Sequence, residues 1–145
     1  MKSITEVSVE LENKPGTLSE MSELLGSNGI NILALAITPK GGSATVRLVV
    51  GDPARVENIM NSAGYAAEKQ QILAVKIPDH PNALNAILKP LRVAGVNVES
   101  IYTCMDSQAS SGSTIMMLGV DELQKAHDAL SKEWIQLYGE ELYEV

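Results

Sequence analysis

The sequence predicts an α+β fold made of two βαββαβ units, each an antiparallel sheet with both helices on one face. Two observations lead to this prediction. The second half of the chain repeats the first, and each half alternates segments of period two with segments of helical spacing. The chain has 145 residues, so its length alone would predict one domain. The repeat instead divides it into residues 1–69 and 70–145.

The repeat becomes visible when the sequence is displaced by 66 positions. A proline turn then coincides with a second proline turn, and a Gly-apolar-Asn-apolar segment with a second such segment. These are positions that shape the backbone, so chance is a poor explanation of the match. The identical pairs are Val9/Val75, Pro15/Pro81, Leu18/Leu84, Leu25/Leu91, Gly29/Gly95 and Asn31/Asn97.

In the first unit, residues 13–16 and 40–43 contain turn-forming residues and are expected to connect regular elements. Gly29 stands where a left-handed helix C-cap is needed. Asp52 followed by Pro53 is typical of a helix start. The expected elements are strand 7–11, helix 17–28, strand 30–38, strand 44–50, helix 53–63 and strand 65–69.

The second unit repeats this order, with a turn at residues 79–82 and a loop at residues 106–112. Asp121 is expected to cap the second helix of the unit. Pro90 is expected to remove a backbone hydrogen bond from the first helix and to bend it. The expected elements are strand 71–77, helix 84–94, strand 97–105, strand 113–120, helix 122–132 and strand 134–138.

The order βαββαβ is the ferredoxin-like split βαβ arrangement. Right-handed crossovers place both helices of a unit on one face of its sheet. A unit this small buries little apolar area, so its other sheet face or its edge strands need a partner. The second unit of the chain or a homodimer would supply one.

Composition and charge exclude several classes of protein. The net charge of −7 and the absence of Phe argue against a nucleic acid partner and against binding to an anionic membrane surface. A single cysteine forms no internal disulfide, and no apolar run reaches the length of a membrane span. The N-terminus lacks the apolar core of a signal peptide. A cytoplasmic location is therefore expected.

The inventory of reactive side chains predicts no catalysis. Two histidines and one cysteine cannot supply a metal cage of thiolate and imidazole ligands. The chain offers no set of Ser, His and Asp, no Cys and His pair with an orienting group, and no paired carboxylates in an expected cleft. We therefore expect no metal, no cofactor and no enzymatic activity.

Two segments resemble a known family. Residues 9–18, VELENKPGTL, followed by GINI at residues 29–32, resemble the first half of an ACT domain. Residues 75–84, VKIPDHPNAL, with GVNV at residues 95–98, are similar to a second copy. ACT domains are ferredoxin-like modules that bind amino acids and regulate metabolic enzymes. The resemblance implies two ACT domains, an amino acid ligand, a homodimer, and regulation of a metabolic enzyme in trans.

The proline turn has the chemistry of a carboxylate site. Gly16 lets a ligand approach the backbone closely, and the N–H groups of Gly16, Thr17 and Leu18 are expected to be free because a helix starts there. The amide oxygen of Asn13 or Asn31 would accept hydrogen bonds from an ammonium group. By resemblance, the ligand lies between this turn and a strand of a neighbouring unit. The resemblance assigns Asn13, Lys14, Pro15, Gly16, Thr17, Leu18 and Asn31 to the first site, and Asp79, His80, Pro81, Asn82, Ala83, Leu84 and Asn97 to the second.

The two turns differ, and simpler interpretations stay open. Asn82 replaces Gly16 and would crowd a ligand, although Asn tolerates positive φ. Asp79 replaces Asn13 and adds negative charge, so the first turn is the better amino acid site. In the simpler interpretation, Gly16 serves only the turn, and Asn31 and its counterpart serve only the start of a strand. The alternative function is a ligand-independent oligomerisation or protein-interaction module.

Overall fold

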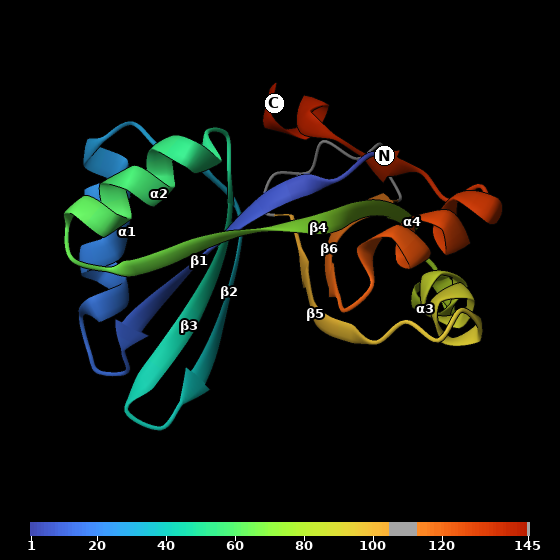
Figure 1. Cartoon of the computed structure of the whole chain (residues 1–145), viewed down its shortest axis with the longest axis horizontal. Coiled ribbons are helices and arrows are strands. Elements are labelled where there is room, and N and C mark those ends of the chain that lie inside the picture. The colour runs from blue at the N-terminus through green and yellow to red at the C-terminus, as the bar shows by residue number, and fades with distance from the viewer. Residues whose placement is uncertain (105–112, 145) are drawn as a thin grey trace. The chain divides into compact units, whose positions relative to one another are not determined.

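The computed structural model describes residues 1–104 and 113–144 (Figure 1). They form a mixed α/β fold with antiparallel strands and four α-helices, which confirms the predicted pair of βαββαβ units. The N-terminal unit comprises Thr5–Gln70, and the C-terminal unit combines Met1–Ile4 with Gln71–Val145. The expected loop at residues 106–112 lies outside the described residues.

The N-terminal unit has the strand order β2-β3-β1-β4. Strands β1 and β2 both pair antiparallel with β3, so that Val9 lies opposite Val46 and Leu35 opposite Leu48. Its elements are β1 (Ile4–Glu12), α1 (Thr17–Ser27), β2 (Ile32–Lys40), β3 (Ser43–Val50), α2 (Pro53–Ser62) and the first part of β4 (Ala66–Pro78).

The C-terminal unit repeats this topology. The second part of β4 pairs with both β6 and β7, and β6 pairs with β5. The resulting order, β7-β4-β6-β5, is the order of the N-terminal unit. Its further elements are α3 (Ala83–Val93), β5 (Val98–Thr103), β6 (Ser113–Val120), α4 (Leu123–Lys132), β7 (Leu137–Tyr138) and a short 3-10 helix at Glu140–Glu144.

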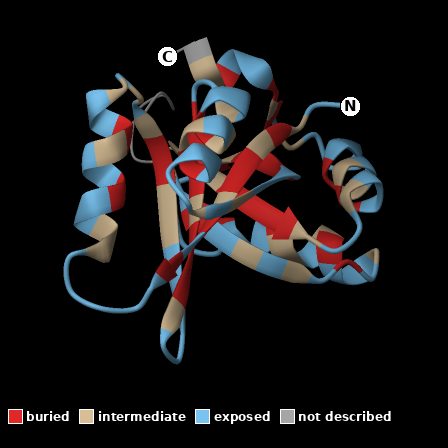
Figure 2. Ribbon diagram, turned by 60° about the vertical axis from the view of Figure 1, so that its left-hand side comes forward, coloured by how far each residue is buried: buried red, intermediate tan, exposed pale blue. Residues whose placement is uncertain are grey.

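Each unit has its own core between its sheet and its two helices (Figure 2). Alternate residues of β1, namely Val7, Val9 and Leu11, are buried against Met21 and Leu25 of α1, as the period of two predicts. The C-terminal core consists of aliphatic residues in the same way. Aliphatic residues and methionines therefore fill the space that Phe would otherwise occupy in a core.

Two strand predictions are wrong. The strands expected at 65–69 and 71–77 are one strand, β4, because no turn residue separates them. The strand expected at 134–138 is reduced to Leu137–Tyr138. Trp134 has φ 60°, a left-handed conformation that cannot belong to a strand.

The helix ends agree with the sequence in part. Asp52 caps α2, because its Oδ1 accepts a hydrogen bond from Arg55 N at 3.2 Å. Asp121 does not cap α4, which begins after Glu122 without a side-chain cap. Asp121 Oδ1 instead accepts a hydrogen bond from Asn97 N at 2.9 Å. This bond connects the start of β5 to the start of α4. Helix α3 continues through Pro90 to Val93.

Candidate functional site

The turn between β1 and α1 places a glycine at the helix start. Gly16 is the N-cap residue of α1, with φ 91° and ψ −19°, and no side chain caps the helix. Glycine adopts this left-handed conformation without steric cost. The turn closes through Glu20 N, which donates to Gly16 O at 2.9 Å, and Thr17 N, which lies 3.4 Å from Lys14 O.

Two of the three N–H groups expected to be free have no partner. No described residue accepts a hydrogen bond from Gly16 N or Leu18 N. The third, Thr17 N, makes the long bond to Lys14 O and is therefore partly occupied. Gly16 is exposed and Leu18 is half-buried, so both donors lie near the surface. The start of α1 thus presents an uncapped, positive helix end to a ligand.

The side chains of Asn13 and Thr17 hold the turn in place. Thr17 Oγ1 lies 2.7 Å from Glu12 O and 3.0 Å from Lys14 O, so its hydroxyl is directed at the turn's own backbone. Asn13 Nδ2 donates to Gly41 O at 3.1 Å, in the hairpin between β2 and β3. The amide oxygen of Asn13 has no described partner and is available to accept.

Lys14 brings a positive charge to the turn. Its Nζ lies 2.9 Å from Glu12 Oε2. The hydrogen bond that Lys14 donates to Glu12 raises the pKa of Lys14, and the charges of Glu12 and Glu20 raise it further. Lys14 is therefore cationic at neutral pH, although Glu12 offsets part of its attraction for an anion.

The second turn has the same backbone. Asn82 is the N-cap residue of α3 with φ 67°, which confirms that Asn takes the place of the glycine. Ala83 N donates to His80 O at 3.1 Å, and Ala86 N donates to Asn82 O at 3.2 Å. These are the two hydrogen bonds of the first turn, displaced by 66 positions.

The side chains of the second turn differ from those of the first. Ala83 has no hydroxyl where the first turn has Thr17. His80 Nδ1 lies 2.8 Å from Pro81 O, so the ring nitrogen donates within the turn. Asp79, Pro81 and Leu84 are exposed. The second turn therefore shares the backbone of the first turn but differs from it in its charged and polar side chains.

Asn31 does not lie beside the turn of its own unit. It precedes β2, whose first residue pairs with Val50, whereas Lys40 at the other end pairs with Ser43 beside the turn. The 9 residues of β2 separate the two ends by about 30 Å. Asn97 is placed in the same way before β5. One amino acid cannot contact the turn and this asparagine within one unit.

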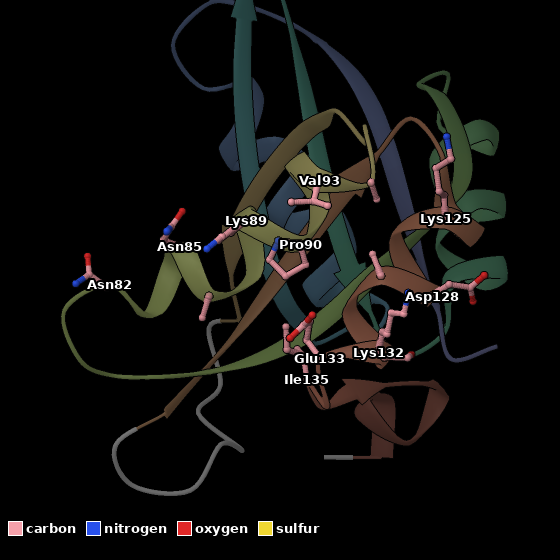
Figure 3. A pocket seen from close by; sticks show the side chains of 14 residues that line it. Asn82, Asn85, Lys89, Pro90, Val93, Lys125, Asp128, Lys132, Glu133 and Ile135 are labelled. Atoms are coloured by element: carbon pink, nitrogen blue, oxygen red, sulfur yellow. The ribbon is translucent and has the colours of Figure 1, made fainter.

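A groove that the sequence did not predict lies between α3 and α4 (Figure 3). Its walls carry Lys89, Pro90 and Val93 from α3, and Lys132 from α4. Of the residues assigned to the two sites, only Asn82 borders it. The sequence gives one sign of this groove: the apolar Val93 follows Lys89 by about one helical turn.

The described residues contain no group of His, Cys, Asp and Glu side chains arranged to hold a metal ion. In the same part of the chain, every helix is too short or too polar to cross a membrane.

Two ferredoxin-like units follow each other in the chain, and in each the helix after the first strand begins without a side-chain cap. The family model of the ACT domain pair matches residues 2–144. The chain therefore belongs to the ACT domain pair family, and the resemblance seen in the sequence is confirmed.

Solved structures with the same fold include protein BT0572 from Bacteroides thetaiotaomicron. It has a TM-score of 0.88 and 25% sequence identity, over 99% of this chain and 97% of that one. The ligand-free regulatory subunit of aspartate kinase from Thermus thermophilus has a TM-score of 0.64 at 13% identity, over 92% and 94%. The regulatory subunit of aspartate kinase from Thermus flavus has a TM-score of 0.61 and 16% sequence identity, over 90% of this chain and 92% of that one. No curated protein sequence matches this chain.

Proposed function

We propose that this chain is an amino acid-binding regulatory protein with one ACT domain over residues 1–69 and another over 70–145. The observation that carries the proposal is Gly16, left-handed at the uncapped start of α1, with no described partner for Gly16 N or Leu18 N. Family membership supports it. Two structural relatives are regulatory subunits of aspartate kinase, which supports regulation of a metabolic enzyme in trans.

The α-carboxylate of the ligand accepts hydrogen bonds from Gly16 N and Leu18 N at the positive end of α1. Lys14 adds a cation next to this site. The ammonium group donates to the amide oxygen of Asn13, whose nitrogen is already bound to Gly41 O. A zwitterion is therefore matched at both of its charges, while the net charge of the chain has little influence.

Gly16 suits both the backbone of the turn and the approach of a ligand. Its φ of 91° favours glycine, but a Cβ atom added there would meet no atom within 4 Å, so packing does not require one. Asn82 adopts the same conformation with a side chain, so the backbone does not strictly require one either. In the second turn that side chain occupies the path of a ligand, and Asp79 opposes a carboxylate. The first turn is the preferred site.

Regulation follows from the distance between the turn and Asn31. A ligand that contacts the turn of one unit and Asn31 of a neighbouring ACT unit joins the two and favours one arrangement of them. The neighbouring unit is supplied by a homodimer. The regulated enzyme would respond to this arrangement of the two units. Such enzymes act in the cytoplasm, so we expect the regulation to take place there.

Isothermal titration with each of the twenty amino acids tests the proposal. We expect millimolar or tighter binding of at least one amino acid, and its loss in Gly16→Asn. Asn82→Gly is the matched control, because it changes the equivalent residue of the other turn and should preserve that binding. No binding of any amino acid to the unaltered chain would overturn the proposal.

A ligand-independent interaction module is the second candidate. It is favoured by exposed isoleucines on the two strands that end the sheet order: Ile37 on β2 is 45% exposed and Ile101 on β5 is 40% exposed. Edge strands of this kind, each paired on one side only within the described order, associate readily. This candidate predicts a stable oligomer whose melting temperature responds to no amino acid, so one thermal scan separates the two functions.

A further inference from the structure

The exposed side of α3 and α4 carries large apolar side chains in water. Val93, at the end of α3, is 78% exposed, and Trp134, just beyond α4, is 94% exposed. The two helices lie against each other and form the groove of Figure 3, which Val93 lines and Trp134 does not. Exposed apolar residues beside a groove are typical of a protein-binding surface.

Trp134 stands where the other repeat has a glycine. Helix α4 follows α2 at a displacement of 70 positions, which places Trp134 on Gly64. Both are left-handed, with φ 60° and 92°, and both donate their N–H to the residue three positions earlier, at 3.1 Å. This conformation costs free energy for a bulky residue. Neither the backbone nor the core of the unit explains the tryptophan, whereas contact with another protein surface does.

Cations outnumber carboxylates on this surface although the chain has a net charge of −7: the groove is lined by Lys89, Lys125 and Lys132 together with Asp128 and Glu133. Lys89, Arg92 and Lys132 are exposed, and none of them makes an ion pair with a described residue. We name Lys89, Arg92, Val93, Lys132 and Trp134 the basic face.

The equivalent side of α1 has the opposite charge, whereas α2 carries the exposed cation Arg55. On α1, Glu23 occupies the place of Lys89, and Glu20 the place of Ala86. Both glutamates are exposed, and neither lies within ion-pair distance of a described cation. Gly26 and Ser27 stand where α3 has Arg92 and Val93, and a Cβ atom added at Gly26 would meet nothing. We name Glu20, Glu23, Gly26 and Ser27 the acidic face.

We propose that the basic face of one copy of this chain binds the acidic face of a second copy. Lys89 and Lys132 pair with Glu20 and Glu23, and the small residues Gly26 and Ser27 leave room for the indole of Trp134. The two faces have opposite charges and complementary side-chain sizes, at positions that the repeat makes equivalent. A buried Trp surrounded by charge pairs is a common centre of a protein interface. The proposal does not depend on amino acid binding.

Sedimentation equilibrium of three samples tests this pairing. Glu20→Lys with Glu23→Lys makes both faces basic, and Lys89→Glu with Lys132→Glu makes the basic face acidic. We expect each double variant alone to associate about tenfold more weakly than the unaltered chain, or worse. An equimolar mixture of the two should recover the association, because each contact again joins opposite signs.

Two kinds of control distinguish an effect of the two faces from an effect of the overall charge of the chain. Lys40→Glu and Glu140→Lys make the same charge changes at exposed residues outside both faces and should leave association unchanged. Trp134→Gly introduces the residue of the other repeat, so it should fold with an undiminished melting temperature and lose association. Emission of Trp134, the only tryptophan in the chain, should shift to shorter wavelength when copies associate.

Three results would overturn the proposal. One is a chain that stays monomeric at high micromolar concentration. The second is association that neither double variant weakens. The third is a mixture of the two double variants that associates no better than each alone.

Discussion

Gly16 and Asn82 hold the same left-handed backbone conformation at the starts of α1 and α3, with φ 91° and 67°. Each accepts a hydrogen bond at its carbonyl from the residue four positions later, at 2.9 Å and 3.2 Å. The two repeats therefore contain one turn built with two different side chains. This relationship lets the proposed ligand site be altered without altering the fold.

Gly16→Asn should keep the fold and lose the ligand. The second repeat shows that Asn fits this conformation, so the free energy of unfolding should change by less than about 1 kcal/mol. The amide side chain would cover the N–H groups that bind the carboxylate. Circular dichroism measures the stability, and isothermal titration measures the affinity. Binding that survives in a folded Gly16→Asn variant would move the site away from this turn.

Thr17→Val should weaken the N-terminal unit without reaching its core. The hydroxyl of Thr17 lies 2.7 Å from Glu12 O, and its loss should lower the free energy of unfolding by about 1 kcal/mol. Ser19→Ala is the control, because Ser19 is exposed on the same helix and its hydroxyl makes no hydrogen bond with a described residue. Urea denaturation of both variants checks the difference. Equal stability of the two would show that the hydroxyl does not support the turn.

Arg47→Met should destabilise the chain more than any turn variant. Glu6 is fully buried, and its Oε1 accepts hydrogen bonds from Arg47 Nη1 at 3.0 Å and from Gln70 Nε2 at 2.9 Å. Removing the cation leaves a buried carboxylate poorly compensated, at a cost of about 3 kcal/mol.

The double variant Glu6→Leu with Arg47→Met isolates this pair. It should recover much of the stability, because no buried charge then remains. Thermal and urea unfolding of the single and double variants measure the coupling. A double variant less stable than Arg47→Met would contradict the argument.

Ligand affinity should fall at alkaline pH as Lys14 loses its proton. The hydrogen bond that Lys14 donates to Glu12 raises the pKa of Lys14 above its ordinary value of 10.5. The cation is therefore present below that value and is lost as the pH rises past the raised pKa. Glu12→Gln should lower the pKa of Lys14, and an NMR titration of the lysine side chain measures it. An unchanged titration in Glu12→Gln would mean that Glu12 does not hold the lysine.

The sequence predicted the elements well where the repeat and turn residues agreed. Asp52 caps α2 as expected, and the alternation of Val7, Val9 and Leu11 marks the buried side of β1. The two strands expected on either side of residue 70 could not be recognised as one, because β4 is long and its polar middle resembles a connection.

The site was predicted less completely, for a topological reason. The resemblance grouped Asn31 with the turn at residues 13–18, yet β1 and β2 begin at the same end of the sheet and the turn lies at the other. The unpaired N–H groups of Gly16 and Leu18 were foreseen from the helix start, whereas the bond from Thr17 N to Lys14 O depends on how the turn closes. The left-handed Trp134 could not be foreseen, because its side chain contributes nothing to its own core.

The most direct test of the central claim is an NMR titration of the ¹⁵N-labelled chain with the amino acid that binds. We expect the amide signals of Gly16 and Leu18 to shift most and to saturate, while those of Asn82 and Leu84 shift less. If the largest shifts lie away from Gly16 and Leu18, or if none of the twenty amino acids moves these two signals, the turn between β1 and α1 is not the ligand site.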